Sequence, residues 1–192
     1  MGTDRLEAFS DGVLAIIITI MVLELKLPHD ASLTALGALA PVFGSYVLSF
    51  VYVGIYWNNH HHMLHVTQRT TGSIMWANLH LLFWLSLLPF ATAWMGENHF
   101  ARWPTIIYGI DLLACALAYF VLGRRIIAVE GANGPLGRAV GGDFKGKLSP
   151  AFYIVGIAGA WLWTPIAGMA CFVAVALLWL VPDRRIERAV AG

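Results

Sequence analysis

Five apolar stretches, separated by short polar segments, constrain this chain more than any other feature. They run from Phe9 to Leu27, Leu33 to Trp57, Ile74 to Met95, Pro104 to Ile127 and Pro150 to Val181. A bilayer core of about 30 Å needs roughly 20 apolar helical residues per crossing. A soluble domain would expose far more than 12% charged residues. The stretches predict one all-α integral membrane domain over residues 1–192, and we expect the first stretch to be retained rather than cleaved as a signal peptide.

The last stretch is too long for one crossing and holds Pro165 near its middle, where a proline interrupts helical hydrogen bonding. The placement of lysine and arginine decides between a kink and a hairpin. With six crossings and cytoplasmic termini, Lys26 and Arg102 fall outside and the other ten of the 12 basic residues fall inside, as the positive-inside rule prefers. We therefore expect a hairpin, a flexible linker at 130–148, and six transmembrane helices at about 9–27, 33–57, 74–95, 104–127, 150–163 and 165–181.

One face of the first span carries an apolar stripe. On a helical wheel at about 100° per residue, this face holds Ile16 and, within roughly 60° of it, Gly12, Thr19, Ile20, Leu23 and Leu27. Such a stripe is typical of helix packing, and a single threonine in a membrane helix usually bonds to its own backbone. The pattern alone therefore does not establish an ion path.

Ser10 and Asp11 lie about 120° to 140° away from that stripe. Polar groups in apolar surroundings are costly unless paired, so we expect both to hydrogen-bond to neighbouring helices near the cytoplasmic end. The second span ends in YWNNHHHMLH and the third begins with MWANLHLL. These segments and the start of the first span predict a polar lock that includes Arg5, Phe9, Ser10, Asp11, Trp57, His60, His61, Trp76, Asn78 and His80. The alternative is that Ser10 and Asp11 merely cap the first helix.

His60, His61, His62 and His65 invite a metal hypothesis, since residues 61 and 65 share a helix face. A membrane di-iron enzyme would need several such clusters, whereas the whole chain has seven histidines. We therefore expect no enzyme activity and no metal or other cofactor. The net charge of +1 gives no reason to expect a nucleic-acid partner. Two other functions stay open, a proton pathway through Asp11 and the histidines, and a purely structural membrane role.

Several segments carry a family resemblance. RLEAFSD followed by GVLAIIITIMVLELKLP resembles the first-helix signature of the transmembrane protein 175 family, the lysosomal potassium channel and its prokaryotic relatives. The resemblance continues in SFVYVGIYWNNHH, NLHLLFWLSLLPFATAWMGE and ALLWLVPDRRIE, and so covers nearly all the chain in order. Animal members fuse two six-helix units, whereas prokaryotic members carry one per chain. The resemblance therefore implies a homotetramer in a bacterial inner membrane.

In that family the first helices of four units surround the ion path. The resemblance implies that Ile16 forms the narrowest ring, that Thr19 contributes to selectivity, and that Ile20 and Leu23 form two further apolar rings. A narrow apolar ring gates by dewetting, and the chain has no TVGYG carbonyl filter. We expect a channel that passes potassium in preference to sodium, with the bilayer, potassium ions and other copies of itself as partners. The alternative is a proton-permeable channel or a proton-coupled transporter.

Overall fold

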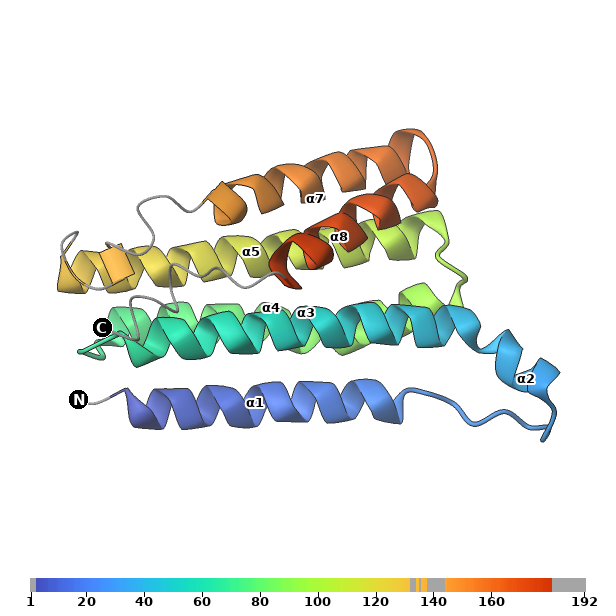
Figure 1. Ribbon diagram of the computed structural model, residues 1–192, viewed down its shortest axis with the longest axis horizontal. Coiled ribbons are helices and arrows are strands. Elements are labelled where there is room, and N and C mark those ends of the chain that lie inside the picture. The colour runs from blue at the N-terminus through green and yellow to red at the C-terminus, as the bar shows by residue number, and fades with distance from the viewer. Residues whose placement is uncertain (1–2, 132–133, 135, 138–143, 181–192) are drawn as a thin grey trace.

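The computed structural model describes residues 3–131, 134, 136–137 and 144–180 (Figure 1). All regular structure within these residues is helical, which confirms the predicted all-α class. Figure 1 shows the long helices side by side, with α1 along one edge of the bundle and α7 along the opposite edge. The helices are α1 (Asp4–Leu23), α2 (Leu33–Ala38), α3 (Ala40–His65), α4 (Gly72–Glu97), α5 (Arg102–Glu130), α7 (Phe144–Leu162) and α8 (Pro165–Leu180).

Four of the described helices, α1, α3, α4 and α5, are long and apolar enough to cross a membrane. Helix α8 is apolar but has 16 residues, and α7 carries Lys145 and Lys147 ahead of its apolar part. The four long helices account for the membrane class of the chain. Six crossings stay a prediction.

Helix α1 begins and ends earlier than its predicted span. Asp4 and Glu7 lie in its first turn, where negative charge favours the helix dipole. Pro28 disfavours helical backbone at the residue before it, and Leu27 lies outside the helix with its side chain exposed. The prediction that Leu27 belongs to the helical stripe is therefore wrong. The start at Asp4 also places Ser10 beyond the first turn, so the capping interpretation is wrong as well.

The second predicted span is broken into two helices, α2 and α3, with Leu39 between them. Pro41 lies in the first turn of α3, where the missing N–H of a proline is not needed. In the middle of one continuous helix the same proline would remove a hydrogen bond. Helix α3 then continues past Trp57 to His65, so the histidine-rich segment is helical.

The chain reverses direction at Pro165, so α7 and α8 form a hairpin rather than one kinked helix. The two helices pack on each other and on α5. This packing depends on glycines. A Cβ on Gly156 would lie 2.7 Å from Cε1 of Phe172, and one on Gly168 would lie 2.9 Å from Cβ of Ala160. Small residues permit such close approach between membrane helices.

Parts of two predictions lie outside the described residues. The predicted linker falls between α5, which ends at Glu130, and α7, which begins at Phe144, and only a few of its residues are described. The end of the ALLWLVPDRRIE segment is not among the described residues either. The same holds for four of the arginines that contribute to the charge asymmetry, Arg138, Arg184, Arg185 and Arg188.

The core holds buried hydroxyl groups as well as apolar side chains. The Tyr52 hydroxyl donates a hydrogen bond of 2.6 Å to the backbone carbonyl of Phe172. The Tyr108 hydroxyl lies 3.0 Å from Oγ of Ser49, and the Thr92 hydroxyl lies 2.6 Å from the same oxygen. These bonds join α3, α4, α5 and α8. Helix α1 rests on the α3 and α4 side of this core.

Candidate functional site

One face of α1 is anchored to the rest of the subunit. Its buried side chains are Ser10, Leu14, Ile17 and Met21, which recur every three or four residues and therefore share one side of the helix. Helices α3 and α4 cover this side. The three apolar side chains pack along most of the contact, and Ser10 makes a polar contact near the start of the helix.

A chain of buried hydrogen bonds links α1, α4 and α3. The Asn78 side-chain amide donates to Oγ of Ser10 at 2.9 Å, and Oδ1 of Asn78 lies 2.6 Å from Nε2 of His60. The Ser10 hydroxyl donates in turn to the backbone carbonyl of Leu6 at 2.8 Å. With the amide oxygen as acceptor, His60 carries a hydrogen on Nε2. Its Nδ1 has no hydrogen-bond partner within the part of the chain that the structure describes.

Two further pairs join α1 to α3. The Trp57 indole N–H donates to Oδ1 of Asp11 at 3.1 Å, and Nδ1 of His61 lies 2.6 Å from Oε1 of Glu7, an ion pair when the histidine is protonated. The Trp57 and His61 rings are stacked with centroids 6.2 Å apart. Sequence reasoning missed Glu7. The available signal was spacing, because residues 7 and 11 on one helix and 57 and 61 on the other are each one turn apart.

Four predicted members of the polar lock lie outside it. Arg5 is exposed and forms no ion pair with any described residue. His80 accepts a hydrogen bond of 3.0 Å from Trp84 on its own helix, and Trp76 is exposed. Phe9 is also exposed, on the same side of α1 as Ile16.

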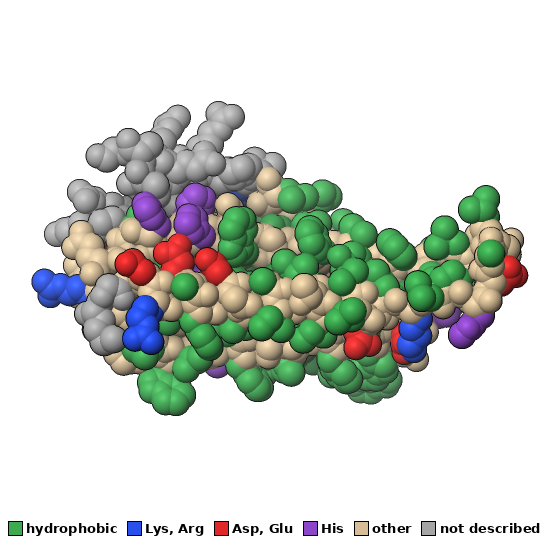
Figure 2. All heavy atoms as spheres, turned by 90° about the horizontal axis from the view of Figure 1, so that it is seen from below, with side chains coloured by type: hydrophobic (Ala, Val, Ile, Leu, Met, Phe, Trp, Pro, Cys, Tyr) green, Lys and Arg blue, Asp and Glu red, His purple; other side chains and the backbone are tan. Residues whose placement is uncertain are grey.

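The opposite face of α1 is not covered by any described helix of the same subunit. Its side chains are exposed, 58% for Ile16 and 80% for Leu23, with Thr19 and Ile20 between them. The Thr19 hydroxyl donates to the carbonyl of Ile16 at 2.8 Å, so its oxygen can still accept a hydrogen bond or approach a cation. Figure 2, seen from the side on which α1 lies, shows hydrophobic side chains along this surface and acidic and histidine side chains gathered near one end.

The far end of α1 is tied to α4 by an ion pair. Lys26, in the connection after α1, hydrogen-bonds to Glu97, the last residue of α4. Both side chains are exposed, and the hydrogen bond to Glu97 raises the pKa of Lys26. The first helix is thus held to α3 and α4 near its start and to α4 just beyond its end, and its Ile16 face stays open.

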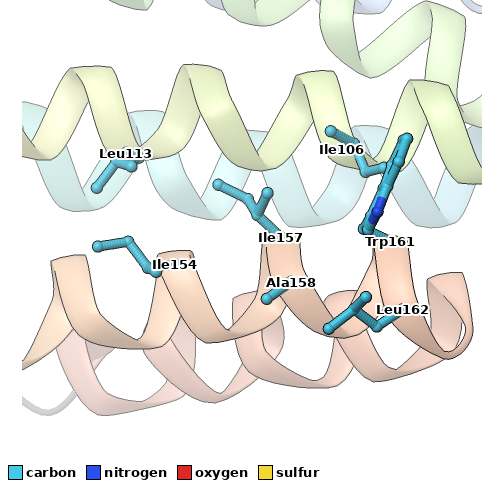
Figure 3. Close-up of a pocket in the computed structure, with 7 residues that line it drawn as sticks. All are labelled: Ile106, Leu113, Ile154, Ile157, Ala158, Trp161 and Leu162. Carbon is cyan, nitrogen blue, oxygen red and sulfur yellow. The ribbon is translucent and has the colours of Figure 1, made fainter.

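A concave surface lies between α5 and α7, away from α1 (Figure 3). It has a volume of about 420 Å³, and the described side chains that line it are apolar. Its lining residues are Ile106, Leu113, Ile154, Ile157, Ala158, Trp161 and Leu162.

The histidines of α3 stack rather than converge on one point. The His61 and His65 rings have centroids 6.0 Å apart and are nearly parallel. Among the described residues, no three His, Cys, Asp or Glu side chains gather as a metal site requires.

The fold and this site define an all-helical membrane protein in which the first helix is anchored on one face and open on the other. Residues 5–89 match the family model described as "Endosomal/lysosomal potassium channel TMEM175". A potassium channel of Chryseobacterium sp. (strain P1-3) is 53% identical over 190 residues, which cover 99% of this chain and 98% of that one. The chain belongs to the TMEM175 family of ion channels, which confirms the resemblance seen in the sequence.

Two further comparisons agree with this assignment. A potassium channel of Streptomyces collinus (strain DSM 40733 / Tue 365) is 36% identical over 126 residues, which cover 62% of this chain and 61% of that one. The fold is similar to the crystal structure of a lysosomal potassium-selective channel TMEM175 homolog from Chamaesiphon minutus. That similarity has a TM-score of 0.78 at 27% identity and covers 95% of this chain and 97% of the other.

Proposed function

We propose that the protein is a potassium channel in which α1 of four identical subunits surrounds the ion path. One observation carries this proposal. Ile16, Thr19, Ile20 and Leu23 lie exposed along one face of α1, whereas the opposite face is held to α3 and α4. One helix cannot enclose a pore, so further copies must supply the other walls. The Chryseobacterium and Streptomyces relatives are named potassium channels, and this supports potassium as the permeant ion.

In this mechanism Ile16 forms the narrowest ring. Four isoleucine side chains offer no ligand to an ion, so a closed ring excludes water and blocks conduction. A small outward movement of α1 wets the ring, and potassium passes with part of its hydration shell. Potassium loses water more readily than sodium, and the Thr19 hydroxyls, nearly one turn along the helix, provide oxygen atoms beside the constriction. Ile20 and Leu23 extend the apolar section of the path.

The remaining features of the proposal follow from the sequence. Each subunit crosses a bacterial inner membrane six times, because the hairpin of α7 and α8 returns the chain to the side on which it started. Both termini are cytoplasmic, as the distribution of lysine and arginine favours. The channel needs no resident cofactor, and its partners are lipid, potassium ions and three further copies of the chain.

The test is ion flux in liposomes that contain the purified full-length protein. Ile16→Asn places a polar side chain in the constriction and is expected to raise potassium flux. Ile154→Asn is the matched control, because Ile154 is an isoleucine of α7 with a similar exposed fraction, 56% against 58%. Equal flux in Ile16→Asn and wild type would contradict the assignment of the constriction.

Selectivity is tested in the same liposomes. Thr19→Ala removes the hydroxyl and is expected to lower the ratio of potassium to sodium flux, whereas Thr19→Ser keeps the hydroxyl and is expected to preserve the ratio. An unchanged ratio in Thr19→Ala would show that this side chain does not contribute to selectivity.

Proton permeation is the second candidate function. The observation that favours it is the placement of titratable groups on α1 and its neighbour, Glu7 against His61 and Asp11 against Trp57. A histidine changes charge near neutral pH and can pass a proton on. Acidification of vesicles that contain no potassium, followed with a trapped pH dye, would support proton permeation. Flux that requires potassium would support the channel proposed above.

A further inference from the structure

A buried carboxyl group lies in the middle of the fold, away from the open face of α1. Asp111 is on α5, nine residues after Arg102, which is about 13 Å along the helix axis. Its side chain is only 5% exposed, and neither carboxylate oxygen has a hydrogen-bond partner among the described residues. Sequence reasoning missed it, although a single aspartate inside the apolar stretch of α5 was the available signal.

Hydroxyl and thiol side chains share the side of α5 on which this carboxyl lies. Tyr108 and Cys115 lie about one turn before and after it on α5, and Tyr56 approaches from α3. Tyr108, Leu112 and Cys115 are fully buried, which leaves little room for a hydrated ion.

The other elements around this cluster also contribute neutral side chains. The Tyr153 ring of α7 lies beside the rings of Tyr52 and Phe172, with centroids 6.4 and 6.3 Å away. Helix α4 reaches the cluster through Thr92, which bonds to the serine that contacts Tyr108, and Phe172 of α8 packs against the Tyr108 ring.

Among the described residues, no basic side chain forms an ion pair with Asp111. Its carboxylate is buried, and neither oxygen has a hydrogen-bond partner in the described part of the chain. A neighbouring subunit cannot supply the missing partner, because the side chain is buried within its own chain. An isolated carboxylate in an apolar interior is far more costly than a neutral carboxylic acid, which also gains a hydroxyl that can donate a hydrogen bond.

From this geometry we propose that Asp111 is a proton-binding site within each subunit, distinct from the ion path along α1. The bound proton keeps the carboxyl neutral in the buried core of the subunit. Loss of the proton would place an unpaired negative charge in this core, so the stability of the subunit depends on proton concentration through this residue. The inference does not rest on the proposed function. The proposed ion path lies along α1, which packs on α3 and α4, whereas Asp111 lies on α5. Asp111 also lies about 140° around α5 from Ile106, which faces the groove of Figure 3.

Infrared spectroscopy of the full-length protein in lipid tests the protonation directly. The wild type is expected to show the C=O stretching band of a protonated carboxyl at neutral pH. Asp111→Asn should lose this band, and the matched control Asp30→Asn, in an exposed loop, should keep it. Asp111→Glu should keep a protonated band at a shifted frequency, which identifies the residue even if the asparagine variant does not assemble. Carboxylate bands from Asp111 at neutral pH would overturn the proposal, and a response of those bands to potassium would instead identify a cation site.

Thermal unfolding provides a second measurement. A proton held in the folded state and released on unfolding stabilises the fold, so the wild-type unfolding temperature should fall as pH rises from mildly acidic to mildly alkaline values. Asp111→Asn resembles the protonated side chain and should show a smaller dependence over the same range, whereas Asp30→Asn should follow the wild type. Parallel curves for wild type and Asp111→Asn would contradict proton binding at this position.

Discussion

Replacement of Asn78 by leucine should loosen the attachment of α1 to its own subunit. Leucine has a similar size and fills the space left by the amide, so the change removes hydrogen bonds with little loss of packing. The Ser10 hydroxyl loses the hydrogen bond that it accepts from Asn78 but keeps the one that it donates to the carbonyl of Leu6. His60 loses the only partner that its ring has within the described structure.

The magnitude follows from these two losses. A lost hydrogen bond between membrane helices averages about 0.6 kcal/mol, which applies to Ser10. An unsatisfied polar group in a buried site costs about 1–3 kcal/mol, which applies to Nε2 of His60. Asn78→Leu should therefore reduce the free energy of unfolding by roughly 2–4 kcal/mol.

A double-mutant cycle with His60→Leu tests the reasoning. Once the histidine is leucine, no buried ring nitrogen is left unpaired, so Asn78→Leu should cost much less in that background. The assay is reversible unfolding in detergent micelles. Asn59→Leu is the control, because its amide donates only to the carbonyl of Ile55 in the same helix. Equal costs of Asn78→Leu in both backgrounds would refute the link between the two residues.

Three further predictions concern other contacts of the subunit. Trp57→Phe should remove the hydrogen bond to Asp11 and reduce the free energy of unfolding in detergent by about 1 kcal/mol. Trp76→Phe, at an exposed tryptophan, is the control. An equal loss of stability in the two variants would contradict the contact between Trp57 and Asp11. Gly109→Ala should destabilise the contact of α5 with α7 and α8 by about 1–3 kcal/mol, because the new methyl group overlaps the buried phenylalanine of α8. Gly12→Ala is the control, because a methyl group at that position meets no atom of the chain within 4 Å. Because the partner carboxylate raises the pKa of Lys26, its ion pair should be complete at neutral pH and lost as pH rises through that raised pKa. Lys26→Met should remove this alkaline dependence from the unfolding curve.

Positions along the helices could be predicted from the sequence, because depth in the membrane follows from distance along an apolar stretch. The sequence predicts that Ser10, Trp57, His60 and Asn78 lie at one level, and the structure brings them together at that level. The direction of a side chain around its helix limits such predictions further. His80 follows Asn78 by two residues, which is about 200° on a helix, so the two could not face the same neighbour.

Lateral neighbours could not be predicted in the same way. Hydropathy does not say which helix packs on which, so the hydrogen bond between Ser49 on α3 and Tyr108 on α5 had no sequence signature. Backbone breaks also depend on local chemistry that an apolar average hides. Pro41 divides the second stretch because it fits the first turn of a helix better than the middle of one.

The polar contacts of α1 also have a consequence for biosynthesis. Trp57 follows its partner Asp11 by 46 residues, and Asn78 follows its partner Ser10 by 68 residues. The ribosome therefore delivers α1 to the membrane well before either partner exists. In that interval Ser10 and Asp11 are best satisfied by water at the membrane surface, so the nascent helix is held toward the side of the membrane on which these two residues lie. The arrival of α3 and α4 exchanges this water for the hydrogen bonds of the folded subunit, and the later helices set the final depth of the first.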